Sequence, residues 1–111
     1  MAIKPLRFRG DSLEALRDFS ADARRVAGFQ LDRIQRGLEP NDCKPMATVG
    51  PGVRELRVWD DTGTFRVVYL AKLTEAIYVL HCFQKKTEQT SEKDIRLART
   101  RYKDLIKERR T

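Results

Sequence analysis

Three segments with a period of two occupy the centre of the chain, and they constrain its fold more than any other feature. Their sequences are VRELRVW (53–59), TFRVVYLA (64–71) and AIYVLHCF (76–83), separated by the short links DDTG and KLTE. Side chains of a strand point alternately to its two faces, so this period predicts strands, and links this short predict an antiparallel meander. Both alternating sets of the second and third segments are largely apolar, which predicts a sheet covered on much of both faces.

Segments with helical spacing precede and follow these strands, and the helices they predict can cover the two faces of the sheet. The sequences SLEALRDF, capped by Asp11 or Ser12, and ADARRVAGFQLDRIQRG predict two helices, with Gly37 ending the second. A third helix is expected to begin near Thr90 or Ser91, where SEKD offers a capping pattern, and to run to the end of the chain.

Two further stretches complete the expected fold. Residues 3–9 contain Pro5, which has no N–H to donate to a ladder, and they are expected to form at best an edge strand. Residues 38–52 hold three of the four prolines and read as an irregular connection. The prediction is one α+β domain spanning residues 1–111. In it, two N-terminal helices pack on a twisted antiparallel sheet, an edge strand plus a three-strand meander, and a C-terminal helix covers part of the other face.

Charge is unevenly distributed along the chain. The formal net charge is +7, and residues 84–111 hold ten Lys or Arg against five Asp or Glu, whereas residues 1–83 hold thirteen against eleven. This asymmetry favours a polyanionic or an acidic protein partner near the C-terminal third, with a solvated helix face as the equal alternative. No apolar run is long enough to span a membrane and the N-terminus has no apolar signal core, so a cytoplasmic location and no membrane partner are expected.

Metal and nucleotide sites find little support in the sequence. One histidine, His81, and two isolated cysteines, Cys43 and Cys82, do not make a metal shell, and the chain has no GxGxxG or GxxxxGK[ST] motif. No metal and no cofactor are therefore expected. His81 alternates with Val79 and Phe83, which favours a hydrogen-bonded core histidine over a catalytic one. The two cysteines are expected to be reduced thiols.

Cations placed on strands are the strongest chemical signal. Arg54 and Arg57 lie on the first segment, Arg66 on the second, and Lys85 and Lys86 at the end of the third. Neighbouring strands lie ~4.8 Å apart, so cations from three strands can converge on one anion.

Such a cluster suits phosphodiester cleavage in RNA, where the 2′-OH attacks phosphorus and negative charge builds on the phosphoryl oxygens. A base and an acid are also needed, and the candidates are Glu55, Tyr69 and a lysine whose pKa is lowered by like-charge repulsion within the Lys85–Lys86 pair.

Several motifs in fixed order carry a family resemblance. ELR, FRVVY and LHCFQKKT follow one another, preceded by ADARRVAGFQLDRIQRG and CKPM and followed by AxxRYKDL. The chain thereby resembles the phage-derived branch of the RelE/ParE toxin superfamily, the HigB-like toxins of type II toxin–antitoxin systems. The resemblance implies a RelE-like fold and a ribosome-dependent mRNA endonuclease that inhibits translation, held inactive by a HigA-like helix-turn-helix antitoxin.

The resemblance also implies which residues act. Four basic residues match positions that line the family's concave RNA-binding face, and these predicted catalytic residues are Arg57, Arg66, Lys85 and Lys86. Lys44, Arg54 and Gln84 are predicted to contact RNA, while Glu55 and Tyr69 are the acid–base candidates. Tyr69 also suits a core position. Tyr102 lies on the apolar stripe of the last helix and is expected to pack, although many relatives place an acid or base near the C-terminus.

The sequence also suits two other functions. A ParE-like inhibitor of DNA gyrase would not need the cationic cluster for catalysis. A non-catalytic module that binds nucleic acid or protein would use the basic C-terminal helix, whereas cations spread over three strands favour the endonuclease.

Overall fold

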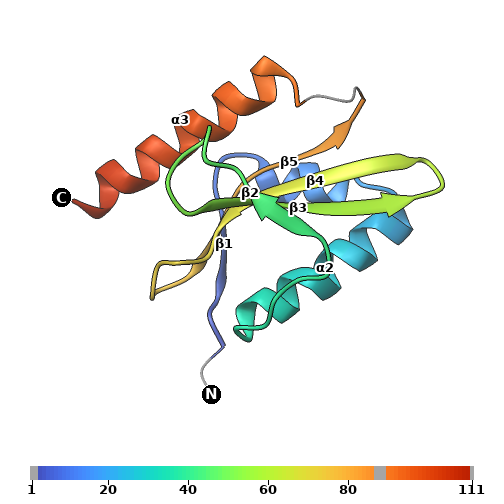
Figure 1. The fold of residues 1–111 in the computed structure, drawn as a ribbon, viewed down its shortest axis with the longest axis horizontal. Helices are drawn as coiled ribbons and strands as arrows, with labels where there is room; N and C mark the ends of the chain where they lie inside the picture. The colour runs from blue at the N-terminus through green and yellow to red at the C-terminus, as the bar shows by residue number, and fades with distance from the viewer. Residues whose placement is uncertain (1–2, 87–89, 111) are drawn as a thin grey trace.

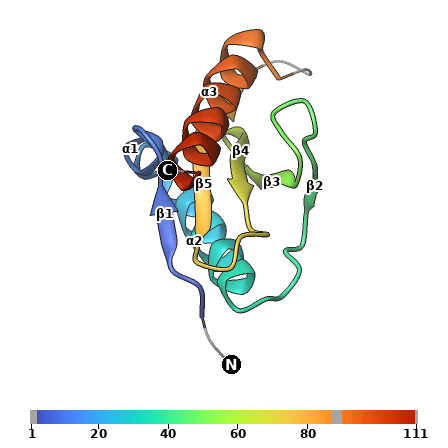
Figure 2. The ribbon, with the colours of Figure 1, turned by 90° about the vertical axis from the view of Figure 1, so that its left-hand side faces the viewer.

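The computed structural model describes residues 3–86 and 90–110, which form three helices and one five-stranded sheet. The strands lie in the order β1-β5-β4-β3-β2, which Figure 2 shows across the molecule. The fold is therefore α+β with a mixed sheet.

The central meander agrees with the period-two pattern. β3 (Val53–Asp60), β4 (Gly63–Leu70) and β5 (Ile77–Lys85) pair antiparallel in sequence order. The β3–β4 turn is closed by Asp60, whose carboxylate accepts hydrogen bonds from the backbone N–H groups of Thr62 and Gly63. Gly63 has a φ of 142°, a conformation that side-chain-bearing residues rarely adopt.

The two edges of the sheet differ from the prediction. β1 (Leu6–Phe8) is an edge strand as expected, but it pairs parallel with β5, so the sheet is not wholly antiparallel. β2 (Cys43–Pro45) is a strand inside the stretch predicted to be irregular, and it pairs antiparallel with β3. Three residues, of which Pro45 is one, give too short a pattern for the alternation to be recognised, and β3 provides the ladder that holds them.

The helices lie close to where the sequence places them. They are α1 (Ser12–Arg17), α2 (Ala21–Gln35) and α3 (Glu92–Arg109). Ser20 and Ser91 cap α2 and α3 through their hydroxyl oxygens, and Gly37, with a φ of 81°, follows the end of α2. Asp11 occupies the N-cap of α1, but its side chain makes no cap hydrogen bond within residues 3–86 and 90–110. Its carboxylate binds Arg101 of α3 instead.

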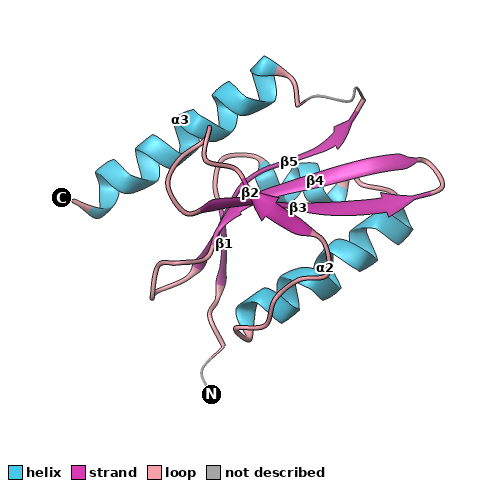
Figure 3. Ribbon diagram, viewed as in Figure 1, coloured by secondary structure: helices cyan, strands magenta, loops and turns pink. Residues whose placement is uncertain are grey.

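The sheet is covered on both faces, as the apolar alternation predicts. Figures 1 and 3 show α2 and α3 on opposite sides of the strands. Side chains of α1 and α2 pack on one face of the sheet against Leu56, Val67 and Val79, and we call it the α2 face. α3 and the segment after β2 pack on the other face against residues that include Val53 and Val68, and we call it the α3 face. The second core fills only part of its face, because it reaches Val53 on β3 but not the hairpin end of that strand.

A β-bulge in β5 changes which side chains share a face. Val68 pairs with His81 and Tyr69 pairs with Val79, so Leu80 is an extra residue between them. His81 therefore does not share a face with Val79, which corrects the simple alternation. The bulge lets Ile77 and Val79 face α2 while His81, Phe83 and Lys85 face α3. Lys85 reaches the α3 face only because of this extra residue.

Tyr102 packs as expected. Its ring joins the second core, and its hydroxyl donates a hydrogen bond to the Pro51 carbonyl oxygen at 3.4 Å. Both cysteines are free, and burial raises the pKa of the Cys82 thiol to about 12. Of the helices described, none has the length and apolar character needed to cross a membrane.

The second core gives a direct test of how α3 is held. Leu105 is 2% exposed beneath α3, whereas Leu38 is 50% exposed after α2. Leu105→Ala is expected to lower the free energy of unfolding by about 2–5 kcal/mol, because it removes buried methyl groups and leaves a cavity. The control Leu38→Ala is expected to change it by less than about 0.5 kcal/mol. Urea denaturation measures both, and equal effects would show that α3 does not close a core.

Candidate nucleic-acid interface

The second core leaves the hairpin end of the α3 face uncovered, and we call this region the open part of the face. The strand register decides which side chains lie there. Across β3, β4 and β5 the paired residues form three successive rows, which are Trp59–Thr64–Lys85, Arg57–Arg66–Phe83 and Glu55–Val68–His81. On the edge strand β2, Lys44 pairs with Glu55. We call Lys44, Arg57, Arg66 and Lys85, grouped around Glu55, the basic cluster.

A buried ion pair forms the centre of the basic cluster. Glu55 is 0% exposed and Arg66 4% exposed, and the Arg66 Nε lies 3.3 Å from the Glu55 Oε1. Lys44 Nζ approaches the same oxygen at 3.7 Å, and the Thr90 hydroxyl donates to Oε2 at 3.5 Å. Burial lowers the pKa of Arg66 and the Glu55 charge opposes that shift, so the guanidinium stays protonated at neutral pH. The pair holds a permanent cation within the sheet surface.

The Glu55–Arg66 contact leaves hydrogen-bonding capacity unused. Neither Glu55 Oε1 nor Arg66 Nε has a partner of hydrogen-bond geometry among the described residues, although the two atoms attract each other by charge. Buried polar groups in folded proteins are normally satisfied, and an unsatisfied one calls for an explanation such as a catalytic role or a bound water or ion.

Asp42 holds the second arginine. It precedes β2, where its carbonyl oxygen accepts the Arg57 backbone N–H at 2.9 Å. Its carboxylate Oδ1 lies 2.6 Å from Arg57 Nη2 and accepts a hydrogen bond from Arg57 Nε at 2.8 Å. Its Oδ2 accepts one from Trp59 Nε1 at 3.0 Å. These hydrogen bonds, led by that from Trp59, hold the pKa of Asp42 below its ordinary value. Asp42 thus fixes the orientation of both side chains.

Lys85 extends the cluster to a third strand. Burial, followed by repulsion from Arg66, Lys44 and Arg57, lowers the pKa of Lys85. The direction agrees with the lysine of depressed pKa expected from the sequence, but the main cause is burial, and the repelling cations come from β2, β3 and β4. A groove of about 500 Å³ opens beside it, and its lining includes Lys44, Glu55, Lys85, Thr90, Glu92 and Ile95.

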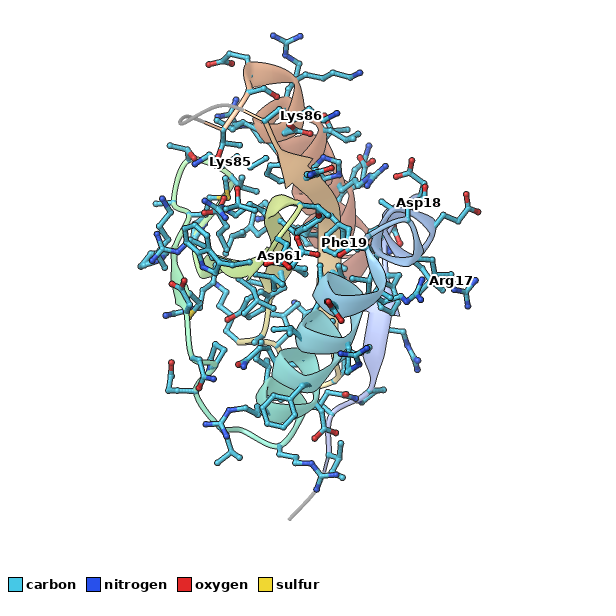
Figure 4. All side chains as sticks on the ribbon, turned by 90° about the vertical axis from the view of Figure 1, so that its right-hand side faces the viewer. Arg17, Asp18, Phe19, Asp61, Lys85 and Lys86 are labelled. Carbon is cyan, nitrogen blue, oxygen red and sulfur yellow. The ribbon has the colours of Figure 1, made fainter. Side chains whose placement is uncertain are left out.

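Lys86 belongs to the edge of this region. It follows β5, is exposed, and lines a second groove of about 330 Å³ with Phe83, Lys85 and Asp94 rather than the one beside Glu55. Figure 4 shows both lysines at the same end of β5.

Three predicted site residues lie on the α2 face, away from the basic cluster. Arg54 donates to the Cys43 Sγ at 3.0 Å, and Gln84 donates to the Thr62 carbonyl oxygen at 3.2 Å beside the hairpin. Tyr69 is 1% exposed in the core under α2, and burial raises its pKa. Strand alternation explains this placement. Each of the three is the sequence neighbour of a residue on the α3 face: Arg54 of Glu55, Gln84 of Lys85, and Tyr69 of Val68. Tyr69 is therefore placed as a core residue, and it is not positioned to act with the cluster.

His81 and Asp94 form a separate polar contact. His81 Nε2 lies 2.7 Å from Asp94 Oδ1 in the first turn of α3, and the Ser91 hydroxyl donates to Asp94 Oδ2. The His81 ring stacks on Phe83 with centroids 5.1 Å apart. The predicted hydrogen-bonded core histidine is confirmed, and the contact ties β5 to α3.

Sequence reasoning missed Asp42 and Trp59. Trp59 follows Arg57 by two residues and so shares its face, a signal that strand alternation contains. Asp42 gave no such signal, because it lies in the stretch read as irregular. Across residues 3–86 and 90–110, His, Cys, Asp and Glu side chains form no group of three that could hold a metal ion.

Comparison with known proteins gives one family. A model of phage-derived Gp49-like proteins matches residues 14–103, which include all the strands of the basic cluster and most of α3. No curated protein matches the chain.

The central ion pair predicts a stability effect. Glu55→Ala leaves the buried Arg66 uncompensated and is expected to lower the free energy of unfolding by about 3–5 kcal/mol. Adding Arg66→Met should recover much of that loss, because the unpaired charge is then gone. Urea denaturation measures both variants, with the exposed Glu39→Ala as control. A Glu55→Ala variant as stable as the control would mean that the pair is not buried in solution.

The Asp42 contacts predict a pH effect. Because the folded pKa of Asp42 is lowered, its contribution to stability is complete above the ordinary aspartate value of ~3.9 and is lost as pH falls through the lower folded value. Trp59 is the only tryptophan, so its emission should change in that range below pH ~3.9. Asp42→Asn should remove the transition. Circular dichroism must show a folded chain throughout, and an unchanged transition in the variant would contradict the assignment.

Proposed function

Because the chain belongs to the phage-derived Gp49-like family, we propose that it is the toxin of a toxin–antitoxin system that cleaves mRNA on the ribosome. Family membership is compatible with such a toxin. The observation that carries the endonuclease proposal is the convergence of Lys44, Arg57, Arg66 and Lys85 from four strands on one face of the sheet, where Lys44 and Lys85 line a groove.

The cluster fits the charge that develops in RNA cleavage. The 2′-oxygen attacks the adjacent phosphorus, the bond to the 5′-oxygen breaks, and the products are a 2′,3′-cyclic phosphate and a free 5′-OH. Arg57 and Arg66 are adjacent across β3 and β4, so their guanidinium groups can bind the non-bridging oxygens as charge builds on them. Preorganised donors of this kind are worth ~10²–10³ in rate each. Here Glu55 and Asp42 supply the preorganisation.

Proton transfer falls to Lys85 in this proposal. The reaction takes one proton from the 2′-OH and gives one to the 5′-oxygen. A lysine of lowered pKa holds its proton less tightly than an ordinary lysine, which suits donation to the leaving oxygen. Glu55 is fully buried against Arg66, which suits a positioning residue better than a base. The proposal leaves acceptance of the 2′-OH proton to a group brought by the ribosome.

Neutralisation by an antitoxin is part of the same proposal. A HigA-like helix-turn-helix protein would act by covering the basic cluster or by blocking entry to the ribosome. An acidic segment would match the cluster, whose four cations outnumber the two carboxylates that pair with them, Glu55 and Asp42.

Induced expression in a bacterial host tests the function. The protein should stop growth and produce new transcript 5′ ends inside reading frames, mapped by sequencing. Lys85→Ala should reduce cleavage ~10²-fold or more, and Lys86→Ala should reduce it much less, because Lys86 does not line the groove beside Glu55. Lys103→Ala, exposed on α3, is the control.

The same experiment separates the alternatives. Growth arrest with intact transcripts and inhibited gyrase would replace the endonuclease by a gyrase inhibitor. RNA binding without growth arrest or transcript cleavage would support the non-catalytic binding module instead.

A further inference from the structure

Trp59 is the most exposed large hydrophobic side chain among the described residues. It is 59% exposed on the open part of the α3 face, two positions from Arg57 on β3. A tryptophan ring offers a large apolar area together with one polar N–H group, a combination that is enriched at interfaces.

The indole is held in place although it is exposed. Its Nε1–H donates to Asp42 Oδ2 at 3.0 Å, while the other oxygen of that carboxylate binds Arg57. The Arg66 guanidinium carbon lies 5.9 Å from the indole ring centroid, within cation–π range. The ring therefore has a fixed edge and a defined relation to both arginines, which leaves less conformational entropy to lose on binding a flat ligand.

The spacing suits a single nucleotide. Two residues along a strand span ~7 Å, which separates Trp59 from Arg57, and Arg66 lies on the neighbouring strand ~4.8 Å away. A phosphate bound by the arginines would thus have an aromatic surface beside it. Proteins that bind single-stranded nucleic acid combine these two elements, a cationic track and an aromatic stacking surface.

We propose that Trp59 stacks on an unpaired nucleobase of single-stranded RNA whose adjacent phosphate is bound by Arg57 and Arg66. The inference rests on the proposed function and deepens it by naming the form of the substrate. A base within a duplex has both faces occupied by its neighbours, so a stacking contact selects an unpaired or unstacked base. Stacking is tolerant of base identity, so Trp59 favours single strands without imposing a strict sequence.

Intrinsic fluorescence tests this directly, because the chain contains one tryptophan. A single-stranded oligoribonucleotide should quench Trp59 emission at low salt. An abasic ribose-phosphate oligomer of the same length should bind through its phosphates with little quenching, and a duplex should quench less than the single strand.

Variants supply the second measurement, by anisotropy of labelled oligomers. Trp59→Leu should weaken binding of the single strand about 5- to 100-fold and change binding of the abasic oligomer much less, because the stacking surface is lost while Asp42 still binds Arg57. Trp59→Phe should recover part of the affinity. Phe29→Leu is the matched control, since Phe29 is 57% exposed on α2, away from the cluster.

The outcomes distinguish a failure of the stacking contact from a failure of the proposed function. If Trp59→Leu binds both oligomers like the wild type while Arg57→Ala weakens both, the phosphate site stands and stacking is wrong. An exposed Trp59 would then suit a protein partner. If the wild type binds neither oligomer and cleaves no transcript, both proposals fall. Equal quenching by the abasic oligomer would also overturn the stacking.

Discussion

The buried contact between Glu55 and Arg66 is the interaction on which the rest of the site depends. A guanidinium that is 4% exposed would be costly beside an apolar core without a carboxylate at 3.3 Å. Glu55 lies at the boundary between Val53, in the core under α3, and Arg57, in the open part of the same strand. The pair therefore marks where packing ends and the basic cluster begins, and it keeps a permanent positive charge within the sheet surface.

Two irregular features of the sheet complete that surface. The extra residue Leu80 turns Lys85 to the face that holds Arg57 and Arg66, while Ile77 and Val79 remain against α2. The short strand β2 brings Lys44 opposite Glu55 and places Asp42 beside Arg57. Bulges commonly redirect side chains at functional sites, and here the redirected group is the lysine whose pKa is lowered.

The cluster combines cations with carboxylates that restrain them. Asp42 orients Arg57 and the Trp59 indole, and Glu55 holds Arg66, so these side chains are largely ordered before any ligand binds. Such preorganisation is what allows fixed charges to stabilise a transition state without further rearrangement. The proposed function and the proposed stacking contact use the same feature, an ordered set of cations and one indole on a partly covered sheet.

The sequence by itself determined the three meander strands, the extents of α2 and α3 and the two-sided cover, because their periods and caps are local and repeat over many residues. It also put Arg57 and Glu55 on one face through strand alternation. Only the tertiary structure decided the parallel pairing of β1, the existence of β2, the position of the bulge and the burial of Tyr69. Each of these depends on hydrogen bonds or packing between segments far apart in the chain, and a one-residue shift in register moves a side chain to the opposite face.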